Sequence, residues 1–327
     1  MNCLMLSVGR RCELLKDFRK TMGDSGKIIA TDISLTAPAI YMADKYYIVP
    51  EITDKNYIPT ILDICKREDI QMVTTLIDPE IMLLAKHRTE FESIGVEVLA
   101  PYEKTAEICF DKFEMYKFLK NKNIRTVLTF GDIESFELAY KKKEIKFPVF
   151  IKPRRGSGSV GARKVENLVA LKNAMIEAPN LIIQEYMGDA LDVDADIYVD
   201  TISGKIVSVF SKKKLETKIG GASKTISFKD NKLVEFVEAA LKLFEFNGPL
   251  DMDLWYKNGV YYLSEINPRF GGAYLHAYGA GVDFVRMIEN NINGKENAPE
   301  FGKYEENVVM MMYDSVVIKK IDAIKGK

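Results

Sequence analysis

Residues 251–269 read Asp251-Met-Asp253-Leu-Trp-Tyr-Lys-Asn-Gly-Val-Tyr-Tyr-Leu-Ser-Glu265-Ile-Asn267-Pro-Arg269. Apolar and polar residues alternate on both sides of Lys-Asn-Gly, which predicts two strands joined by a tight hairpin turn. The two aspartates then share one face of the first strand, as Glu265 and Asn267 do on the second. These side chains offer oxygen ligands, which suit a Mg²⁺ ion whose other ligands are water and phosphate oxygens. Arg269 can bind a phosphate through two parallel hydrogen bonds. The hairpin therefore predicts a magnesium and triphosphate site; an exposed strand edge, the alternative for an isolated carboxylate, is disfavoured by the clustering.

The composition is that of an ordinary globular protein. Its 327 residues are 47% apolar and 28% charged, which allows two or three units with ample core. With 46 basic and 47 acidic residues the net charge is −1, so we expect no nucleic acid and no membrane as partners. The first eleven residues carry their apolar run before their positive charges and are too short for a signal or spanning helix, so we expect a cytoplasmic protein.

Cysteine and histidine give no sign of a metal centre. The four cysteines show neither a CxxC motif nor Cys/His ligand spacing, and there are only two histidines, His87 and His276. We therefore expect buried apolar thiols rather than zinc ligands or disulfides. A packed histidine is the favoured interpretation of His276.

The first hundred residues alternate buried strands with amphipathic helices. Strands are predicted near residues 3–8, 27–32, 44–50 and 72–77, with helices over 12–22 and 57–66. This alternation is typical of a parallel, doubly wound α/β sheet. Ligands of such sheets lie at the carboxyl ends of the strands, here residues 7–11, Asp32 and residues 78–80, although a plain turn explains Gly9 and Asp32 equally well. Arg10 and Arg11 could bind a substrate carboxylate or phosphate, and helix-surface arginines are equally plausible.

From about residue 106 the pattern changes to α+β. A helix over residues 106–121 precedes a series of hairpins and helices, including antiparallel strands over 193–199 and 206–210. Taken alone, the charge run at residues 212–214 would be a solvated turn.

A glycine-rich segment, Gly156-Ser157-Gly158-Ser159-Val-Gly161, matches the spelling of a dinucleotide-binding fingerprint. That fingerprint requires strand, loop and helix, whereas the flanks of this loop both predict strands. The context argues against a dehydrogenase and favours a hairpin tip laid over phosphates, with glycine N–H groups approaching the oxygens. Lys152, at the end of the strand before the loop, could reach an α or β phosphate.

These motifs together resemble the ATP-grasp superfamily, from about residue 112 to residue 269. The similarity is greatest to the branch with the large chain of carbamoyl phosphate synthetase, biotin carboxylase and the stand-alone carboxylate-amine ligases. It implies an ATP-grasp fold behind an amino-terminal doubly wound domain, divided as residues 1–105, 106–185 (with the phosphate-binding loop) and 186–327 (with the metal site). ATP and Mg²⁺ are the implied cofactors, with Mn²⁺ as an alternative metal.

The resemblance also implies roles for individual residues. Lys112 and Lys152 correspond to the two phosphate-binding lysines, and residues 156–161 to the loop that covers the phosphates. The adenine-binding hinge corresponds to Glu185, Tyr186 and Met187. The metal-ligand positions correspond to Asp253, Glu265 and Asn267, and the phosphate-binding arginine corresponds to Arg269.

Some positions depart from the family pattern. Asp192 stands where a ribose-binding glutamate is usual, and it is one methylene shorter. Asp251 corresponds to a neighbouring position that is not a ligand. Lys214, Lys218 and Lys224 fall where relatives place basic residues that contact substrate and γ phosphate, and a mobile basic loop is the alternative. A loop that closes over the site and excludes water is expected, and residues 156–161 and 214–224 are the candidates.

The implied reaction is an ADP-forming ligation. A small carboxylate, with an amino acid or peptide-like acid favoured, attacks the γ phosphate to give an acylphosphate, which an amine then converts to an amide. The alternatives are a carbamoyl phosphate synthetase-like single-unit enzyme, disfavoured because that large chain resembles two fused halves, and an ATP-binding module without catalysis. A homodimer is among the assemblies that the resemblance allows.

Overall fold

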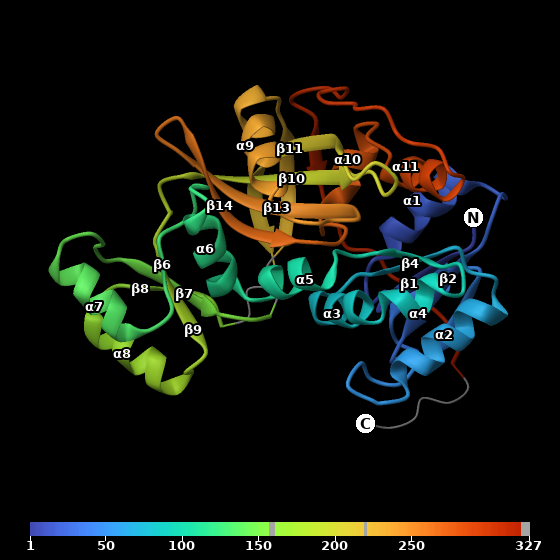
Figure 1. The fold of residues 1–327 in the computed structure, drawn as a ribbon, viewed down its shortest axis with the longest axis horizontal. Coiled ribbons are helices and arrows are strands. Elements are labelled where there is room, and N and C mark those ends of the chain that lie inside the picture. Colours follow the sequence, from blue (N-terminus) through green and yellow to red (C-terminus); the bar gives the residue numbers. More distant parts are fainter. Residues whose placement is uncertain (157–160, 219–220, 322–327) are drawn as a thin grey trace.

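The computed structural model describes residues 1–156, 161–218 and 221–321. Three β-sheets with helices between them make up the fold (Figure 1). As predicted, an amino-terminal parallel sheet precedes mixed α and β structure. Among the described residues, no helix combines the length and the apolar character that crossing a membrane requires.

The amino-terminal sheet is parallel throughout, in the order β3-β2-β1-β4-β5. Alternate residues of β1 enter different cores: Met5 packs with Phe18 on one face, and Leu4 packs with Ile61 on the other. Burial on both faces is why these strands appear as continuous apolar runs in the sequence. The strands are β1 (Cys3–Leu6), β2 (Ile28–Asp32), β3 (Lys45–Ile48), β4 (Met72–Thr75) and β5 (Glu97–Leu99), and the helices are α1 (Cys12–Met22), η1 (Pro38–Met42), α2 (Tyr57–Arg67), α3 (Asp78–Lys86) and α4 (Arg88–Glu92).

The helix predicted over residues 106–121 is two helices, α5 (Glu103–Phe110) and α6 (Lys112–Asn121), so the single helix was wrong. Asp111 separates them, because its backbone is extended and its side chain accepts hydrogen bonds from the N–H groups of Phe113 and Glu114. An aspartate in this position caps the second helix. The cap places Lys112 at the first position of α6.

A four-stranded antiparallel sheet follows, in the order β6-β9-β7-β8, with α7 and α8 packed beside it (Figure 1, lower left). β7 pairs with β8 antiparallel on either side of the glycine-rich loop, which confirms the predicted strand–loop–strand context. The bounds are β6 (Thr129–Phe130), α7 (Ile133–Lys141), β7 (Val149–Pro153), β8 (Arg163–Val165), α8 (Leu168–Glu177) and β9 (Leu181–Glu185).

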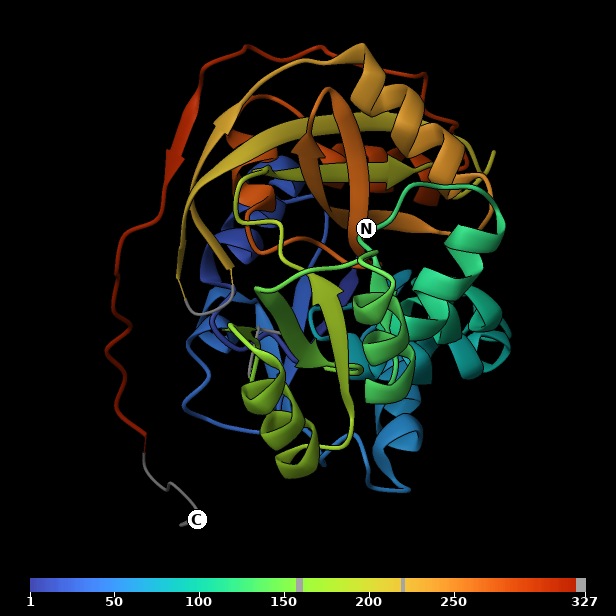
Figure 2. The ribbon, with the colours of Figure 1, turned by 90° about the vertical axis from the view of Figure 1, so that its left-hand side faces the viewer.

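The third sheet has six strands in the order β14-β13-β10-β11-β12-β15. Along β10, Val193, Ala195 and Ile197 enter an apolar core with α9, while the alternate aspartates face the opposite side of the sheet. The chain after β15 runs along the outside of the molecule (Figure 2). The bounds are β10 (Leu191–Val199), β11 (Ile206–Lys218), β12 (Gly221–Ser227), α9 (Asn231–Leu241), β13 (Gly248–Lys257), β14 (Val260–Asn267), α10 (Tyr274–Gly279), α11 (Phe284–Ile292) and β15 (Val309–Met311).

The basic segment after residue 210 is not the loop that the sequence predicts. Apart from residues 219 and 220, which lie outside the described residues, it forms the paired strands β11 and β12. Nor is the charge run at 212–214 a solvated turn, because Lys212 is fully buried and bonds to Asp196. Period two explains the difference: one face of β11 meets the aspartates of β10, so lysines on that face are buried against opposite charge.

Candidate active site

The β13–β14 hairpin brings its polar side chains together as predicted. Asp253 lies opposite Glu265 in the register, and Asp251 lies opposite Asn267. The Asn267 side-chain amide donates to Asp253 at 3.0 Å and to Asp251 at 3.3 Å. The turn residues Asn258 and Gly259 have φ values of 52° and 82°, as the Asn-Gly pair of a tight hairpin requires.

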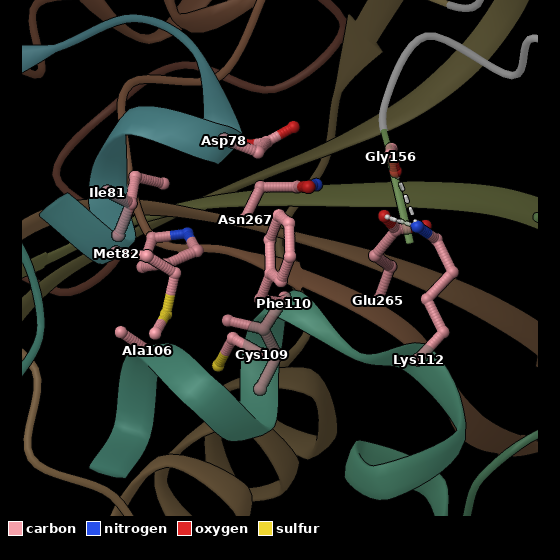
Figure 3. Close-up of a pocket in the computed structure, with 12 residues that line it drawn as sticks. Asp78, Ile81, Met82, Ala106, Cys109, Phe110, Lys112, Gly156, Glu265 and Asn267 are labelled. Atoms are coloured by element: carbon pink, nitrogen blue, oxygen red, sulfur yellow. Dashed lines mark hydrogen bonds and ion pairs between the residues drawn. The ribbon is translucent and has the colours of Figure 1, made fainter. Parts of the chain in front are cut away.

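Two lysines from different elements converge on Glu265. Lys112 Nζ, from the start of α6, lies 3.2 Å from Glu265 Oε1, and Lys152 Nζ, from β7, lies 3.4 Å from Oε2. Lys112 also donates to the Gly156 carbonyl at 2.6 Å, and Figure 3 shows its ammonium between that carbonyl and the Glu265 carboxylate. The capped helix, the strand before the glycine loop and the hairpin thus meet at one point.

The pocket in Figure 3 opens beside this meeting point. Its far wall is apolar and comes from α3 and α5, with Ile81, Met82, Ala106, Cys109 and Phe110. Cys109 is a buried free thiol, as are Cys3 and Cys65, while Cys12 is partly buried and also free. Three of the four cysteines are therefore buried, as predicted, and Cys12 is the exception.

Lys214 lies in β11 among three carboxylates. Its Nζ is 3.2 Å from Asp192 Oδ1 and 2.9 Å from Asp194 Oδ1, and it bonds to Asp253. Burial raises the pKa of Asp253, but the charge and hydrogen bond of Lys214 outweigh this and hold that pKa below its usual value. Burial also raises the pKa of Asp194 well above its usual value, despite Lys214. Lys214 is therefore a cation that three carboxylates share.

Lys218 has different surroundings. Its side chain is 72% exposed, against 12% for Lys214, and its Nζ lies 3.4 Å from Glu216. Lys224 likewise pairs with Glu216, at 2.7 Å. The sequence analysis assigned the same role to all three lysines, but of the three only Lys214 lines the central cleft.

A cleft of about 880 Å³ runs between the sheets and contains most of the predicted site. It is lined by the residues predicted to contact phosphate, ribose or metal, which are Lys112, Lys152, Gly156, Asp192, Lys214, Asp253, Glu265, Asn267 and Arg269. It is also lined by the residues predicted to receive adenine, Glu185, Tyr186 and Met187, together with Gln184 and Trp255. Tyr186 lies under the Lys164 ammonium, and Glu185 lies 3.8 Å from Lys257.

The glycine loop is described only at its ends. Gly156 and Gly161 have φ values of 108° and 77°, conformations that side chains other than glycine rarely adopt. Ser157, Gly158 and Ser159 were also predicted to contact phosphate, and they lie outside the described residues.

Arg269 has a partner that the sequence analysis missed. Its Nε and Nη2 donate to the two carboxylate oxygens of Asp78, at 2.6 and 3.2 Å. The available signal was that residues 78–80 follow the carboxyl end of a parallel strand, where ligands and functional groups gather. His276, by contrast, is buried and shares a 2.8 Å hydrogen bond with Thr225, as expected for a packed histidine.

The oxygen ligands fit a magnesium ion that is shared with phosphate. Within residues 1–156, 161–218 and 221–321 there is no group of three or more His, Cys, Asp or Glu that could hold a metal by itself. Asp253, Glu265 and Asn267 instead offer two carboxylates and one amide oxygen on facing strands. Mg²⁺ is commonly bound by one or two carboxylates together with water and substrate phosphates, so this set of donors is suitable.

Known proteins with related sequences and folds agree with this geometry. An ATP-grasp domain model matches residues 109–273, which is half of the chain, and a PylC-like amino-terminal domain model matches residues 3–99. The D-alanine–D-alanine ligase of Clostridium perfringens (strain SM101 / Type A) is 28% identical over 239 residues, covering 64% of this chain and 75% of that protein.

Two solved structures show a similar fold. N5-carboxyaminoimidazole synthetase from Staphylococcus aureus, complexed with ADP, has a TM-score of 0.74 at 16% identity and covers 92% of this chain and 79% of its own. The biotin carboxylase domain of the Hydrogenobacter thermophilus 2-oxoglutarate carboxylase, in complex with MgADP, has a TM-score of 0.72 at 18% identity, with 94% and 73% covered. The chain belongs to the ATP-grasp family of carboxylate-amine ligases, whose members use ATP and Mg²⁺ and form ADP.

Proposed function

We propose that this protein activates a small carboxylate as an acylphosphate at the expense of ATP and joins it to an amine, releasing ADP and phosphate. The observation that carries the proposal is the convergence of Lys112 and Lys152 on Glu265, beside Asp253 and Asn267, in one cleft. Cations beside oxygen ligands are what a magnesium-bound triphosphate needs.

The proposed nucleotide site runs along the cleft. Lys112, Lys152 and the loop from Gly156 to Gly161 would contact the phosphates, with Ser157, Gly158 and Ser159 as further donors. Glu185, Tyr186 and Met187 would receive the adenine, and their place in the lining of the cleft, which also includes Trp255, supports this role. Asp192 is the proposed ribose contact; its present partner is Lys214.

Asp253, Glu265 and Asn267 are the residues that would hold Mg²⁺. When bound, the metal neutralises charge on the phosphates during transfer. The Asn267 amide nitrogen donates to Asp253, which leaves the amide oxygen as the group that would ligate the metal. Lys214 keeps Asp253 ionised, which preserves it as a ligand at neutral pH.

The substrate acid would be activated near Arg269 and Lys214. Phosphoryl transfer needs positioning and charge stabilisation rather than a nucleophile on the protein, and the carboxylate of the substrate supplies the attacking oxygen. Arg269 and Lys214 are the proposed catalytic cations. We retain Lys218 only as a residue of the β11–β12 hairpin tip, because its ammonium lies outside the cleft in the described structure.

The name of the D-alanine–D-alanine ligase supports an amino acid as the acid and an amine as the acceptor. We further propose a division into units at residues 1–105, 106–185 and 186–327, and the presence of three separate sheets supports it. A homodimer and a cytoplasmic location complete the proposal.

The test is nucleotide product analysis. The purified protein is incubated with Mg-ATP and pools of amino acids and other small carboxylates, with and without amines, and the products are separated by chromatography. Acid-dependent ADP and phosphate support the proposal, and AMP with pyrophosphate contradicts it. Glu265→Ala separates enzyme from binding module, because a pure binder has no turnover to lose.

A further inference from the structure

Two arginines that are far apart in the sequence donate to one carbonyl oxygen. Arg11 Nη2 donates to the Phe270 carbonyl at 2.7 Å, and Arg269 Nη1 donates to the same oxygen at 3.1 Å. Arg11 Nη2 also donates to the Gly271 carbonyl at 2.9 Å. The two guanidinium groups are therefore neighbours, although 258 positions separate them in the sequence.

Arg11 is placed for ligand contact in a way that Arg10 is not. It precedes α1 at the carboxyl end of β1 and lines the cleft together with Leu76, Gly272 and Arg269, whereas Arg10 is exposed on the surface. Among the described residues, the hydrogen bonds of its side chain use only Nη2. Nη1 and Nε thus retain donors for another group.

The backbone opposite Arg11 leaves room for that group. A side chain on Gly272 would begin 3.3 Å from Arg11 Nη1, so glycine at this position keeps the approach to the guanidinium open. Arg269 is anchored on its other edge by Asp78. The hydrogen bonds of Arg11 to two carbonyl oxygens and of Arg269 to Asp78 therefore fix both guanidinium groups before a ligand binds, as preorganised recognition requires.

Holding two guanidinium groups side by side has an electrostatic cost. Burial and then the charge of Arg269 lower the pKa of Arg11 to about 10. Asp251 and Asp196 act in the opposite direction. An anion between the two arginines removes the repulsion and gains charge-assisted hydrogen bonds.

We propose that Arg11 and Arg269 together form a carboxylate-binding site at the end of the cleft next to the amino-terminal sheet. The proposal rests on the ligase function proposed above and adds Arg11 as a substrate-binding residue. The carboxylate can belong to the acid that is activated or to an amino acid that serves as the amine. Both sources share the chemistry of a planar, two-oxygen anion, which a guanidinium group binds by a fork.

Binding is tested without turnover by ¹⁹F NMR. Trifluoroacetate serves as the carboxylate probe, and its transverse relaxation is measured with the MgADP-saturated protein at constant ionic strength. We expect saturable broadening for the wild type and at least about ten-fold weaker binding for Arg11→Ala, because charge-assisted hydrogen bonds are lost. Arg10→Ala is the matched control and should bind as the wild type does.

Two further variants keep the test valid if Arg11→Ala does not fold. Arg11→Lys retains the charge without the fork and should bind more weakly than the wild type. Gly272→Ala retains Arg11 but places a methyl group against Nη1, and it should also weaken binding. No saturable broadening by the wild type, or equal binding by folded Arg11 and Gly272 variants, overturns the proposal.

Steady-state kinetics then assign the source of the carboxylate. A raised KM for the acid alone in Arg11→Lys places the carboxylate on the acid, and a raised KM for the amine alone places it on the amine. Unchanged KM values for both overturn a substrate role for Arg11. If no acid yields ADP with the wild type, the ligase proposal fails, while the NMR result still decides whether the carboxylate site exists.

Discussion

Asp78 and Arg269 form a two-point ion pair that joins the start of α3 to the chain just after the β13–β14 hairpin. The contacts measure 2.6 and 3.2 Å, and each side chain is only 15% exposed. Asp78 begins α3 directly after β4, and Arg269 follows β14, so the pair ties two units that the sequence separates by 191 positions. Because two parallel hydrogen bonds link the two groups, the carboxylate of Asp78 fixes the plane of the Arg269 guanidinium group.

Asp78→Asn should lower kcat about ten-fold while KM for ATP changes less than about two-fold. Asparagine has the shape of aspartate, but it offers one neutral acceptor oxygen where the carboxylate offers two charged ones. The guanidinium group of Arg269 is then less firmly oriented. Steady-state ADP release measures both constants. Asp63→Asn, at an exposed helix pair with Arg67, is the control. A kcat equal to that of the control would show that Asp78 does not position Arg269.

Glu265→Gln should reduce turnover by about two orders of magnitude or more. The change removes the carboxylate that two lysines contact and that would hold the metal, while it keeps the volume of the side chain. The readout is ADP formation over a range of Mg²⁺ concentrations. Glu238→Gln on the exposed face of α9 serves for comparison and should retain wild-type activity. Equal activity in both variants would remove Glu265 from the site.

Lys214→Met should destabilise the fold by about 3–5 kcal/mol at neutral pH, because it leaves buried carboxylates without their cation. Lys214 holds the pKa of Asp253 down, so that carboxylate stabilises the wild type above its unfolded pKa. Without the lysine, ionised carboxylates oppose folding, and their protonation relieves the cost as the pH falls.

The difference in Tm between Lys214→Met and the wild type should therefore be smaller at pH 5 than at pH 8. Circular dichroism melts at the two pH values measure it. Lys218→Met, which alters a largely exposed lysine of the same strand, should melt like the wild type at both. Similar melting of the two variants would contradict the charge balance described for the site.

Glu80→Gln should stabilise the protein at alkaline pH. Glu80 is fully buried, with Thr75 bonded to one carboxylate oxygen, and burial raises its pKa from 4.5 to about 8. A carboxyl with a raised folded pKa contributes stability below its unfolded pKa, and this contribution is lost as the pH rises to about 8.

At pH 9 the gain of Glu80→Gln should be on the order of 2–4 kcal/mol, and near pH 4.5 it should be close to zero. Urea unfolding of both proteins across this range measures the gain. Glu90→Gln, at an exposed residue of the neighbouring helix α4, provides the comparison. A gain that does not depend on pH would contradict the raised pKa of Glu80.

The sequence predicts those features that arise from short-range patterns. The alternation around Asn258 and Gly259 specifies the hairpin, and the register then brings Asp253 opposite Glu265. The strands flanking the glycine loop are likewise local, which is why their antiparallel pairing could be predicted. The amino-terminal sheet follows from repeated strand and helix periods.

Features that depend on distant contacts could not be predicted in the same way. Lys214 and Lys218 differ because the pairing of β11 with β10 ends at Lys213, so that Lys214 lies beside the β10 aspartates and Lys218 lies beyond them. Arg269 could be recognised by its motif, but its partner Asp78 begins α3 in the amino-terminal part of the chain. Such pairs require the packed fold, because nothing in either local sequence specifies the other residue.

The most direct test of acylphosphate chemistry follows the oxygen that the acid gives up. The acid identified by product analysis is labelled with ¹⁸O in its carboxylate and incubated with Mg-ATP, the amine and the protein, and the released phosphate is analysed by mass spectrometry. We predict one ¹⁸O atom transferred to inorganic phosphate for each amide formed, with ADP as the nucleotide product. Label in AMP, or amide formation with unlabelled phosphate, would contradict the proposed mechanism.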